Sequence, residues 1–172
     1  MKFSRAIRKG MKILGIDPGY QRMGWAIIET IKNQNVPLAF GCQETEKNMA
    51  TETRLLQIFN YLMRVIKKYK PQQMAIEELF FAVNAKTAMG VSQARGVIML
   101  AAAQCKIPVT AYAPLVVKQT ICGSGTAEKS QVQKMIMRLF NLKQIPKPDD
   151  AADALAIALT HAYSYRVKGK LK

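Results

Sequence analysis

The sequence predicts an α/β protein in three layers, with helices flanking a mixed five-stranded sheet. Three observations predict this class. Three β-rich segments open the chain, strands and helices then alternate, and no internal repeat, low-complexity segment or linker divides them. With 172 residues and 49% hydrophobic content, the chain is long enough to bury one core, so we expect a single domain.

The three opening segments are Lys12–Ile16, Gly24–Thr30 and the weaker Pro37–Thr45. The first ends at Asp17-Pro18-Gly19, a combination that is typical of a turn. Because only short stretches separate the segments, we expect antiparallel strands joined as a hairpin or meander.

A change of period marks the first helix. Between Glu52 and Lys70, apolar residues recur at intervals of three and four, which predicts a helix that Pro71 closes. The remaining expected elements are a strand, a helix rich in small residues, a fifth strand and two further helices: Met74–Glu77, Asn84–Gln104, Pro108–Tyr112, Ala127–Leu142 and Pro148 to about Tyr165. The last of these helices has a proline near its start and two aspartates in its first turn, as the helix dipole favours. Residues 113–126 have no predicted helix or strand.

Both ends of the chain are basic, and we expect them to lie outside a domain formed by residues 11–165. Residues 1–10 are either a disordered basic extension or the result of a start at Met1 instead of Met11. Residues 166–172 are expected as a short basic tail. The first residues lack the apolar segment of a secretory signal, and no run approaches the roughly 18 apolar residues of a membrane span.

Net charge is the strongest signal in the composition. With 26 Lys and Arg against 11 Asp and Glu, the chain carries +15 at pH 7. Such a charge indicates a polyanionic partner, and nucleic acid is the first expectation. An acidic membrane surface and a merely soluble basic protein stay open as alternatives, although no basic amphipathic helix supports membrane binding.

The cysteines and the single histidine argue against two kinds of site. Cys42, Cys105 and Cys122 are odd in number and far apart, so a disulfide framework is not expected. No pair has Cys-x-x-Cys spacing, and His161 is the only histidine, so a structural zinc site is not expected either. This cysteine usage fits a reduced, cytoplasmic environment.

Four acidic residues stand inside or against apolar stretches. Asp17 and Glu77 each end a short apolar strand, and the i, i+3 spacing of Asp150 and Asp153 places both on one helix face. A buried carboxylate needs a partner, and a salt bridge to a lysine is an open alternative for each acid alone. For the set, convergence at one sheet edge favours Mg²⁺. Two such ions about 3.5–4 Å apart can activate a water against a phosphodiester.

Five stretches carry a resemblance to a known family: "GIDPG…GWAI", "AIEELFF", "SQARGV", "VKQTICGSGTAEKSQVQ" and "DDAADALAIALTHA". They follow in order and cover nearly all of the chain from Met11 to Ala162. The chain resembles the RuvC family, the bacterial Holliday-junction resolvases of the ribonuclease H-like superfamily. The resemblance implies the ribonuclease H-like fold and a location in the bacterial cytoplasm. The departures are the ten-residue extension, Glu78 beside Glu77, and the short tail.

The resemblance also implies which residues form the active site. Its metal ligands and catalytic carboxylates are Asp17, Glu77, Asp150 and Asp153, which would hold two Mg²⁺ ions, with Mn²⁺ as a substitute. The Asp-Ala-Ala-Asp motif selects Asp150 over its neighbour Asp149. Two lysines, Lys118 and Lys129, would act at the scissile phosphate or contact the DNA backbone.

Further DNA-binding residues are expected outside the carboxylate cluster. The resemblance implies that Phe80 stacks on a base, whereas Phe81 is expected in the core. Lys86, Arg95 and Lys134 join the two lysines as candidate phosphate binders, and a solvated basic surface stays open as the alternative for each. The Gly123-Ser-Gly-Thr126 loop could cradle a phosphate, or serve only as a loop with a helix cap.

The small side chains of the Asn84–Gln104 helix allow close approach, either to the sheet or to a partner helix. The resemblance favours the second, a homodimer whose two sites match the two equivalent strands of a junction. It implies Mg²⁺-dependent hydrolysis of two opposed strands during DNA recombination and repair. The ends would be 5′-phosphate and 3′-hydroxyl, with a short thymine-containing cleavage preference and the RuvA–RuvB branch-migration complex as partner.

Two other classes of protein are alternatives to this interpretation. Actin-like and sugar-kinase ATPases share an early Asp-x-Gly turn, but they need a second domain, for which 172 residues leave little room. A junction-binding protein without catalysis would keep the basic surface and would need no clustered acids.

Overall fold

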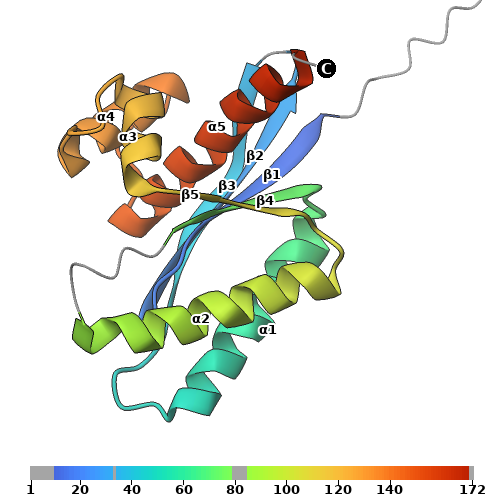
Figure 1. The fold of residues 1–172 in the computed structure, drawn as a ribbon, viewed down its shortest axis with the longest axis vertical. Helices are drawn as coiled ribbons and strands as arrows, with labels where there is room; N and C mark the ends of the chain where they lie inside the picture. The colour runs from blue at the N-terminus through green and yellow to red at the C-terminus, as the bar shows by residue number, and fades with distance from the viewer. Residues whose placement is uncertain (1–9, 33, 79–84, 171–172) are drawn as a thin grey trace, which may run out of the picture.

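The central layer is a five-stranded sheet in the order β3-β2-β1-β4-β5 (Figure 1). The computed structural model describes residues 10–32, 34–78 and 85–170. The strands are β1 (Met11–Asp17), β2 (Arg22–Ile31), β3 (Gln34–Glu44), β4 (Gln73–Glu77) and β5 (Val109–Tyr112). β1, β2 and β3 pair antiparallel, whereas β4 and β5 run parallel to β1. The predicted mixed sheet and its opening meander are confirmed.

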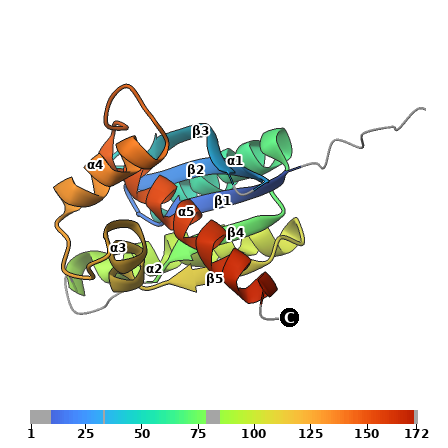
Figure 2. The same ribbon diagram turned by 90° about the horizontal axis from the view of Figure 1, so that it is seen from above.

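Helices cover both faces of this sheet (Figure 2). They are α1 (Thr51–Tyr69), α2 (Ala85–Gln104), α3 (Pro114–Cys122), α4 (Lys129–Leu139) and α5 (Asp149–Lys170). α1 and α2 pack on one face, and α5 crosses the other with α3 and α4 beside it (Figures 1 and 2). The predicted three-layer α/β architecture is therefore confirmed. Within the described residues, no helix combines the length and apolar character needed to cross a membrane.

The alternation of side chains along β1 explains why its sequence is continuously apolar. Ile13 belongs to the core cluster under α5, and Leu14 and Ile16 belong to the cluster under α1 and α2. Successive side chains of a strand point to opposite faces, and here both faces are covered. All three side chains are fully buried.

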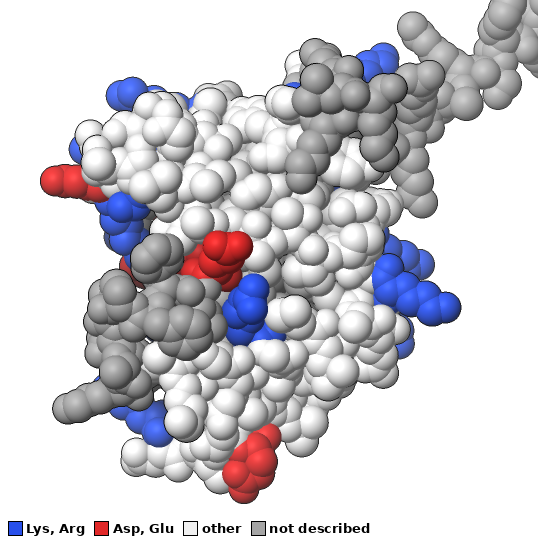
Figure 3. Space-filling model, viewed as in Figure 1, with Lys and Arg blue, Asp and Glu red and all other residues white. Residues whose placement is uncertain are grey.

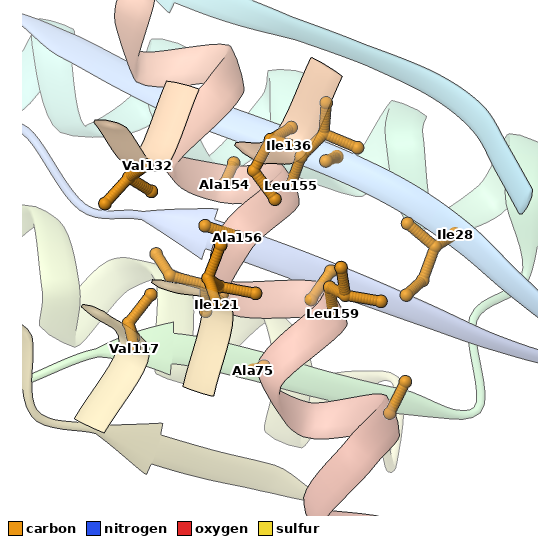
Figure 4. Packing of buried hydrophobic residues seen from close by; sticks show 14 of the residues in the cluster. Ile28, Ala75, Val117, Ile121, Val132, Ile136, Ala154, Leu155, Ala156 and Leu159 are labelled. Carbon is orange, nitrogen blue, oxygen red and sulfur yellow. The ribbon is translucent and has the colours of Figure 1, made fainter. Parts of the chain in front are cut away.

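Small residues let α5 approach the sheet closely. A Cβ at Gly15 would lie 2.2 Å from the carbonyl oxygen of Ala154, and one at Gly24 would lie 2.1 Å from that of Asp150. The alanines of α5 pack with the aliphatic side chains of α3, α4 and β2 in this layer (Figure 4). Gly24 thus allows the first turn of α5, with its aspartates, to lie directly on β2.

Three expectations about the helices are corrected. Residues 114–122 form α3, which was not predicted, because Val116, Val117 and Ile121 resemble a β-rich run while tertiary packing favours a helix. α4 begins at Lys129 instead of residue 127, because Glu128 is its N-cap in a capping box with Gln131. α5 continues to Lys170, so residues 166–170, expected as a tail, extend the last helix.

Candidate active site at the sheet edge

The ends of two neighbouring strands position the first two carboxylates. β1 ends at Asp17 and the adjacent parallel strand β4 ends at Glu77, with Ile16 and Ile76 paired just before them. Parallel strands end at the same sheet edge, so the two acids lie close enough for the charge of Glu77 to act on Asp17. The first turns of α5 bring Asp150 and Asp153 to the same edge, where both charges act on Asp17.

Burial and mutual repulsion shift the protonation of this cluster. Asp17 is almost completely buried, and its burial, followed by the charges of Glu77, Asp153 and Asp150, raises its pKa well above the usual range. Burial and the charge of Asp153 raise the pKa of Glu77 to about 7. Ionising these buried acids therefore costs free energy, and an added cation would reduce this cost.

Two basic side chains already pair with part of the cluster. Lys129 Nζ lies 2.6 Å from Asp149 Oδ2 and 2.8 Å from Asp153 Oδ2. Arg22 Nη2 lies 2.5 Å from Asp150 Oδ2 and 3.3 Å from Asp149 Oδ1. Burial lowers the pKa of Lys129, but its hydrogen bonds to Asp149 and Asp153 outweigh this effect and raise the pKa above its usual value. For Asp150 and Asp153, the salt bridges weighed as an alternative are therefore present.

A pocket of about 240 Å³ opens between α3, α4 and α5. Glu77, Asp153, Lys118 and Lys129 line it together with apolar side chains. The charges of Lys129 and Lys118 oppose the rise in the pKa of Glu77, so both lysines lie near this carboxylate. Figure 3 shows acidic side chains near the centre of this face with basic side chains beside them. The pocket offers carboxylate oxygens and ammonium groups side by side, which suits a phosphate ester held near a cation.

The donor set fits a hard divalent cation, although the ligands are not gathered around one point. Among the described residues, no three His, Cys, Asp or Glu side chains lie close enough to hold one ion. Arg22 and Lys129 hold Asp150 and Asp153 in ion pairs. The four predicted ligands are all carboxylates, the oxygen donors that Mg²⁺ and Mn²⁺ prefer. Burial raises the pKa of three of them, Asp17, Glu77 and Asp153, and a cation would oppose this rise.

Of the other predicted DNA-binding residues, the two that the structure describes, Arg95 and Lys134, are not gathered with the carboxylates. Arg95 lies on α2, on the opposite face of the sheet from α5. Lys134 is exposed on α4 and lines a separate pocket of about 390 Å³ with Arg138 and the hydroxyls of Ser124 and Thr126. Phe80, Phe81 and the side chain of Lys86 fall outside the described residues.

Two residues of the cluster were missed as contributors. The residues predicted from the sequence do not include Arg22, and the Asp-Ala-Ala-Asp motif selects Asp150 over Asp149. The signal for Arg22 was available, because a hairpin that places Gly24 opposite Asp17 brings the start of β2 to the same sheet edge. Asp149 was recognised only as a first-turn acid, and its role as acceptor for both cations depends on the position of α4 relative to β2.

The fold and this site define a class of protein: an enzyme with a ribonuclease H-like fold and an acidic site suited to cleaving phosphodiesters. The sequence model of the family described as crossover junction endodeoxyribonuclease RuvC matches residues 13–161, and the chain belongs to this family. The resemblance found in the sequence is confirmed.

Similar proteins agree with this assignment along almost the whole chain. The crossover junction endodeoxyribonuclease RuvC of Desulforamulus reducens is 48% identical over 163 residues, which cover 94% of this chain and 100% of the relative. The solved structure of Thermus thermophilus RuvC has 34% identity and a TM-score of 0.86, with 92% of this chain and 97% of that chain covered. A second structure, T. thermophilus RuvC in complex with Holliday junction substrate, has 32% identity and a TM-score of 0.83. The match covers 91% of this chain and 96% of that chain.

Proposed function

We propose that this protein resolves Holliday junctions by metal-dependent hydrolysis of two opposed DNA strands. Its family is that of the crossover junction endodeoxyribonucleases, and one similar solved structure is of a RuvC with a Holliday junction substrate. The observation that carries the proposal is the meeting of Asp17, Glu77, Asp150 and Asp153 at one sheet edge. A binding protein without catalysis would gain nothing from four mutually repelling acids, so the catalytic alternative is favoured.

The four carboxylates are proposed as ligands of two Mg²⁺ ions, with Mn²⁺ able to substitute. Such ions supply an activated water and neutralise charge on the phosphodiester. Asp17 is the most deeply buried of the four and is proposed as the ligand shared by both ions. Its neighbours Asp150 and Asp153, on successive turns of one helix face, would complete the set. Cleavage would leave 5′-phosphate and 3′-hydroxyl ends.

Lys118 and Lys129 are proposed to hold the scissile phosphate. Both line the pocket that also contains Glu77 and Asp153, so their ammonium groups can donate to phosphate oxygens beside the carboxylates. Arg95 and Lys86 are proposed to bind the DNA backbone away from the cleaved bond, and Phe80 is proposed to stack on a base. The net charge of +15 supports such contacts along the junction arms.

A homodimer formed through α2 is proposed as the working form. On α2, Met89 is 74% exposed to solvent and Leu100 is 61% exposed, which gives an apolar surface suited to a partner helix. Two copies related by a two-fold axis would present two sites to the two equivalent strands. The bacterial cytoplasm and the RuvA–RuvB complex are proposed as location and partner, and the three unpaired cysteines support a reducing environment.

Cleavage of a synthetic four-way junction tests the proposed function. Purified protein with Mg²⁺ should nick opposed strands symmetrically, whereas Asp150→Asn should bind the junction and leave it intact. Equal cleavage by this variant, or none by the wild type on a set of junctions that differ in sequence, would contradict the proposal.

A further inference from the structure

Arg22 is the basic residue most closely engaged with a proposed metal ligand. It begins β2, and its guanidinium reaches acidic side chains of two other elements. Nη2 lies 2.5 Å from Asp150 Oδ2 and 3.3 Å from Asp149 Oδ1, both on α5. Nε lies 3.6 Å from Glu44 Oε1 on β3. One guanidinium therefore faces three carboxylates, and its shortest contact is with the one that belongs to the proposed metal site.

The backbone holds Arg22 in this position. Arg22 is paired with Glu44 across the antiparallel strands, and Gly24, two residues later, lies directly under the carbonyl of Asp150. The Asp150 side chain is 18% exposed and the Arg22 side chain 40%, so the pair is partly shielded from water. A partly shielded ion pair is stronger than one fully in water, and removing it leaves a carboxylate with less compensation.

Asp149 connects this ion pair with the one on the other side of the site. Its Oδ1 accepts a hydrogen bond from Arg22, and its Oδ2 accepts one from Lys129, which also pairs with Asp153. Each cation therefore binds one proposed metal ligand and also Asp149. Because Asp149 is 45% exposed and Glu44 68%, either can accept a cation without an additional desolvation cost.

We propose that Arg22 is a displaceable counter-ion of the metal site. In the metal-free protein it neutralises Asp150, and a divalent cation that takes the Asp150 oxygen displaces it onto Asp149 and Glu44. This inference rests on the proposed function in one respect, that Asp150 is a metal ligand. A guanidinium and a metal ion at the same Oδ2 oxygen repel each other because both are positive, so each weakens the binding of the other. The free protein should therefore bind metal more weakly than its carboxylates alone would.

Calorimetric titration of DNA-free protein with Mg²⁺ and, separately, Mn²⁺ tests this competition. Arg22→Gln should bind the metal about fivefold more tightly, the factor expected for removing one partly exposed ion pair. Arg138→Gln is the matched control, because it removes the same charge from an exposed position on α4 and should leave affinity nearly unchanged. Unchanged or weaker binding by Arg22→Gln would overturn the proposal, because it would mean that Arg22 does not compete or that it supports the ligand.

A double-mutant cycle tests Asp149 as the acceptor. Asp149→Asn alone should weaken metal binding about threefold, because Arg22 then has only Asp150 and Glu44 as partners. In the Arg22→Gln background the same change should have a smaller effect, since no guanidinium is left to relocate. Additive effects would mean that Asp149 acts only through its charge, and they would overturn the relocation.

Two further measurements keep the outcome interpretable. Thermal unfolding in EDTA checks that each variant folds, and Arg22→Met, which keeps an unbranched apolar stem, replaces Arg22→Gln if that variant does not. Wild-type protein that takes up no metal would count against the proposed function itself. Wild-type protein that takes up metal and cleaves junctions, with unchanged affinity in the Arg22 variants, would count against the counter-ion alone.

Discussion

Replacing Glu77 by Gln is expected to stabilise the metal-free protein at alkaline pH and to leave its stability nearly unchanged at acidic pH. The pKa of Glu77 rises from 4.5 to about 7 on folding, mainly because the side chain is buried and secondly because Asp153 is negative. The folded protein therefore binds this proton more tightly than the unfolded chain does. The resulting stability is fully present below about pH 4.5 and is lost as pH rises through about 7.

The size of this effect follows from the same pKa. A difference of one pH unit corresponds to about 1.4 kcal/mol, so ionising Glu77 in the folded protein costs at most about 3 kcal/mol at pH 8. Because the side chain keeps some contact with water, we expect about 2 kcal/mol. Gln has nearly the same shape and cannot ionise, so it removes this cost. For a chain of this length the gain corresponds to a rise in Tm of about 4–8 °C.

Thermal unfolding in EDTA at pH 5 and pH 8 measures this effect. Glu78→Gln is the control, because Glu78 is the next residue, is exposed, and should show no such gain. Added Mg²⁺ should stabilise the wild type more than Glu77→Gln, because a ligand that binds the folded state stabilises it. An equal rise in the Tm of Glu77→Gln at both pH values, or a lower Tm at pH 8, would refute the argument that ionised Glu77 destabilises the folded protein.

Two more predictions concern the approach of α5 and the pocket. Gly24→Ala should destabilise the fold by about 2–3 kcal/mol, because its Cβ would meet the backbone of Asp150. Gly96→Ala on α2 is the control, because its Cβ meets nothing within 4 Å and should cost no stability. Chemical denaturation compares the stability of the two variants. Lys118→Met should lower kcat about 100-fold while junction binding changes little, because the variant loses the donor that we propose stabilises charge at the reacting phosphate. Single-turnover cleavage measures this effect. Lys67→Met is the control, because Lys67 is an exposed residue of α1. Equal cleavage by the two variants would contradict the role of Lys118.

Most of the fold could be predicted from the sequence because its elements carry local signals. The intervals of three and four between Glu52 and Lys70 correspond to α1, and the apolar runs correspond to β1 and β4. α3 was missed because its β-branched residues suggest a strand. Its two terminal signals, Pro114 in the first turn and Gly123 in a left-handed conformation at the C-cap, were present but were not used.

The carboxylates of the candidate site were predictable for a different reason. Asp17 and Glu77 each end an apolar strand, so a parallel pairing of the two strands is enough to bring them together. The pairing partners of Asp150 and Asp153 could be found only in part. The β1–β2 hairpin brings Arg22 to this sheet edge, but its contact with Asp150 depends on the closeness that Gly24 allows, and the contact of Lys129 with Asp153 depends on where α4 lies.

Two interpretations of the four acids follow from the sequence: they form salt bridges, or they bind metal ions. From the sequence alone, these interpretations are alternatives. The arrangement around Asp149 suggests that both hold in turn, with salt bridges in the metal-free protein and metal ligation after the ions bind. A chain with a net charge of +15 can place an arginine and a lysine among its few acids, and the lysine, Lys129, opposes the rise in the pKa of Asp17 and Glu77. If divalent ions then replace both cations at Asp150 and Asp153, Asp149 can retain the displaced guanidinium and ammonium groups at the edge of the site. There they would face an incoming DNA backbone, so metal binding and the attraction of phosphate would reinforce each other.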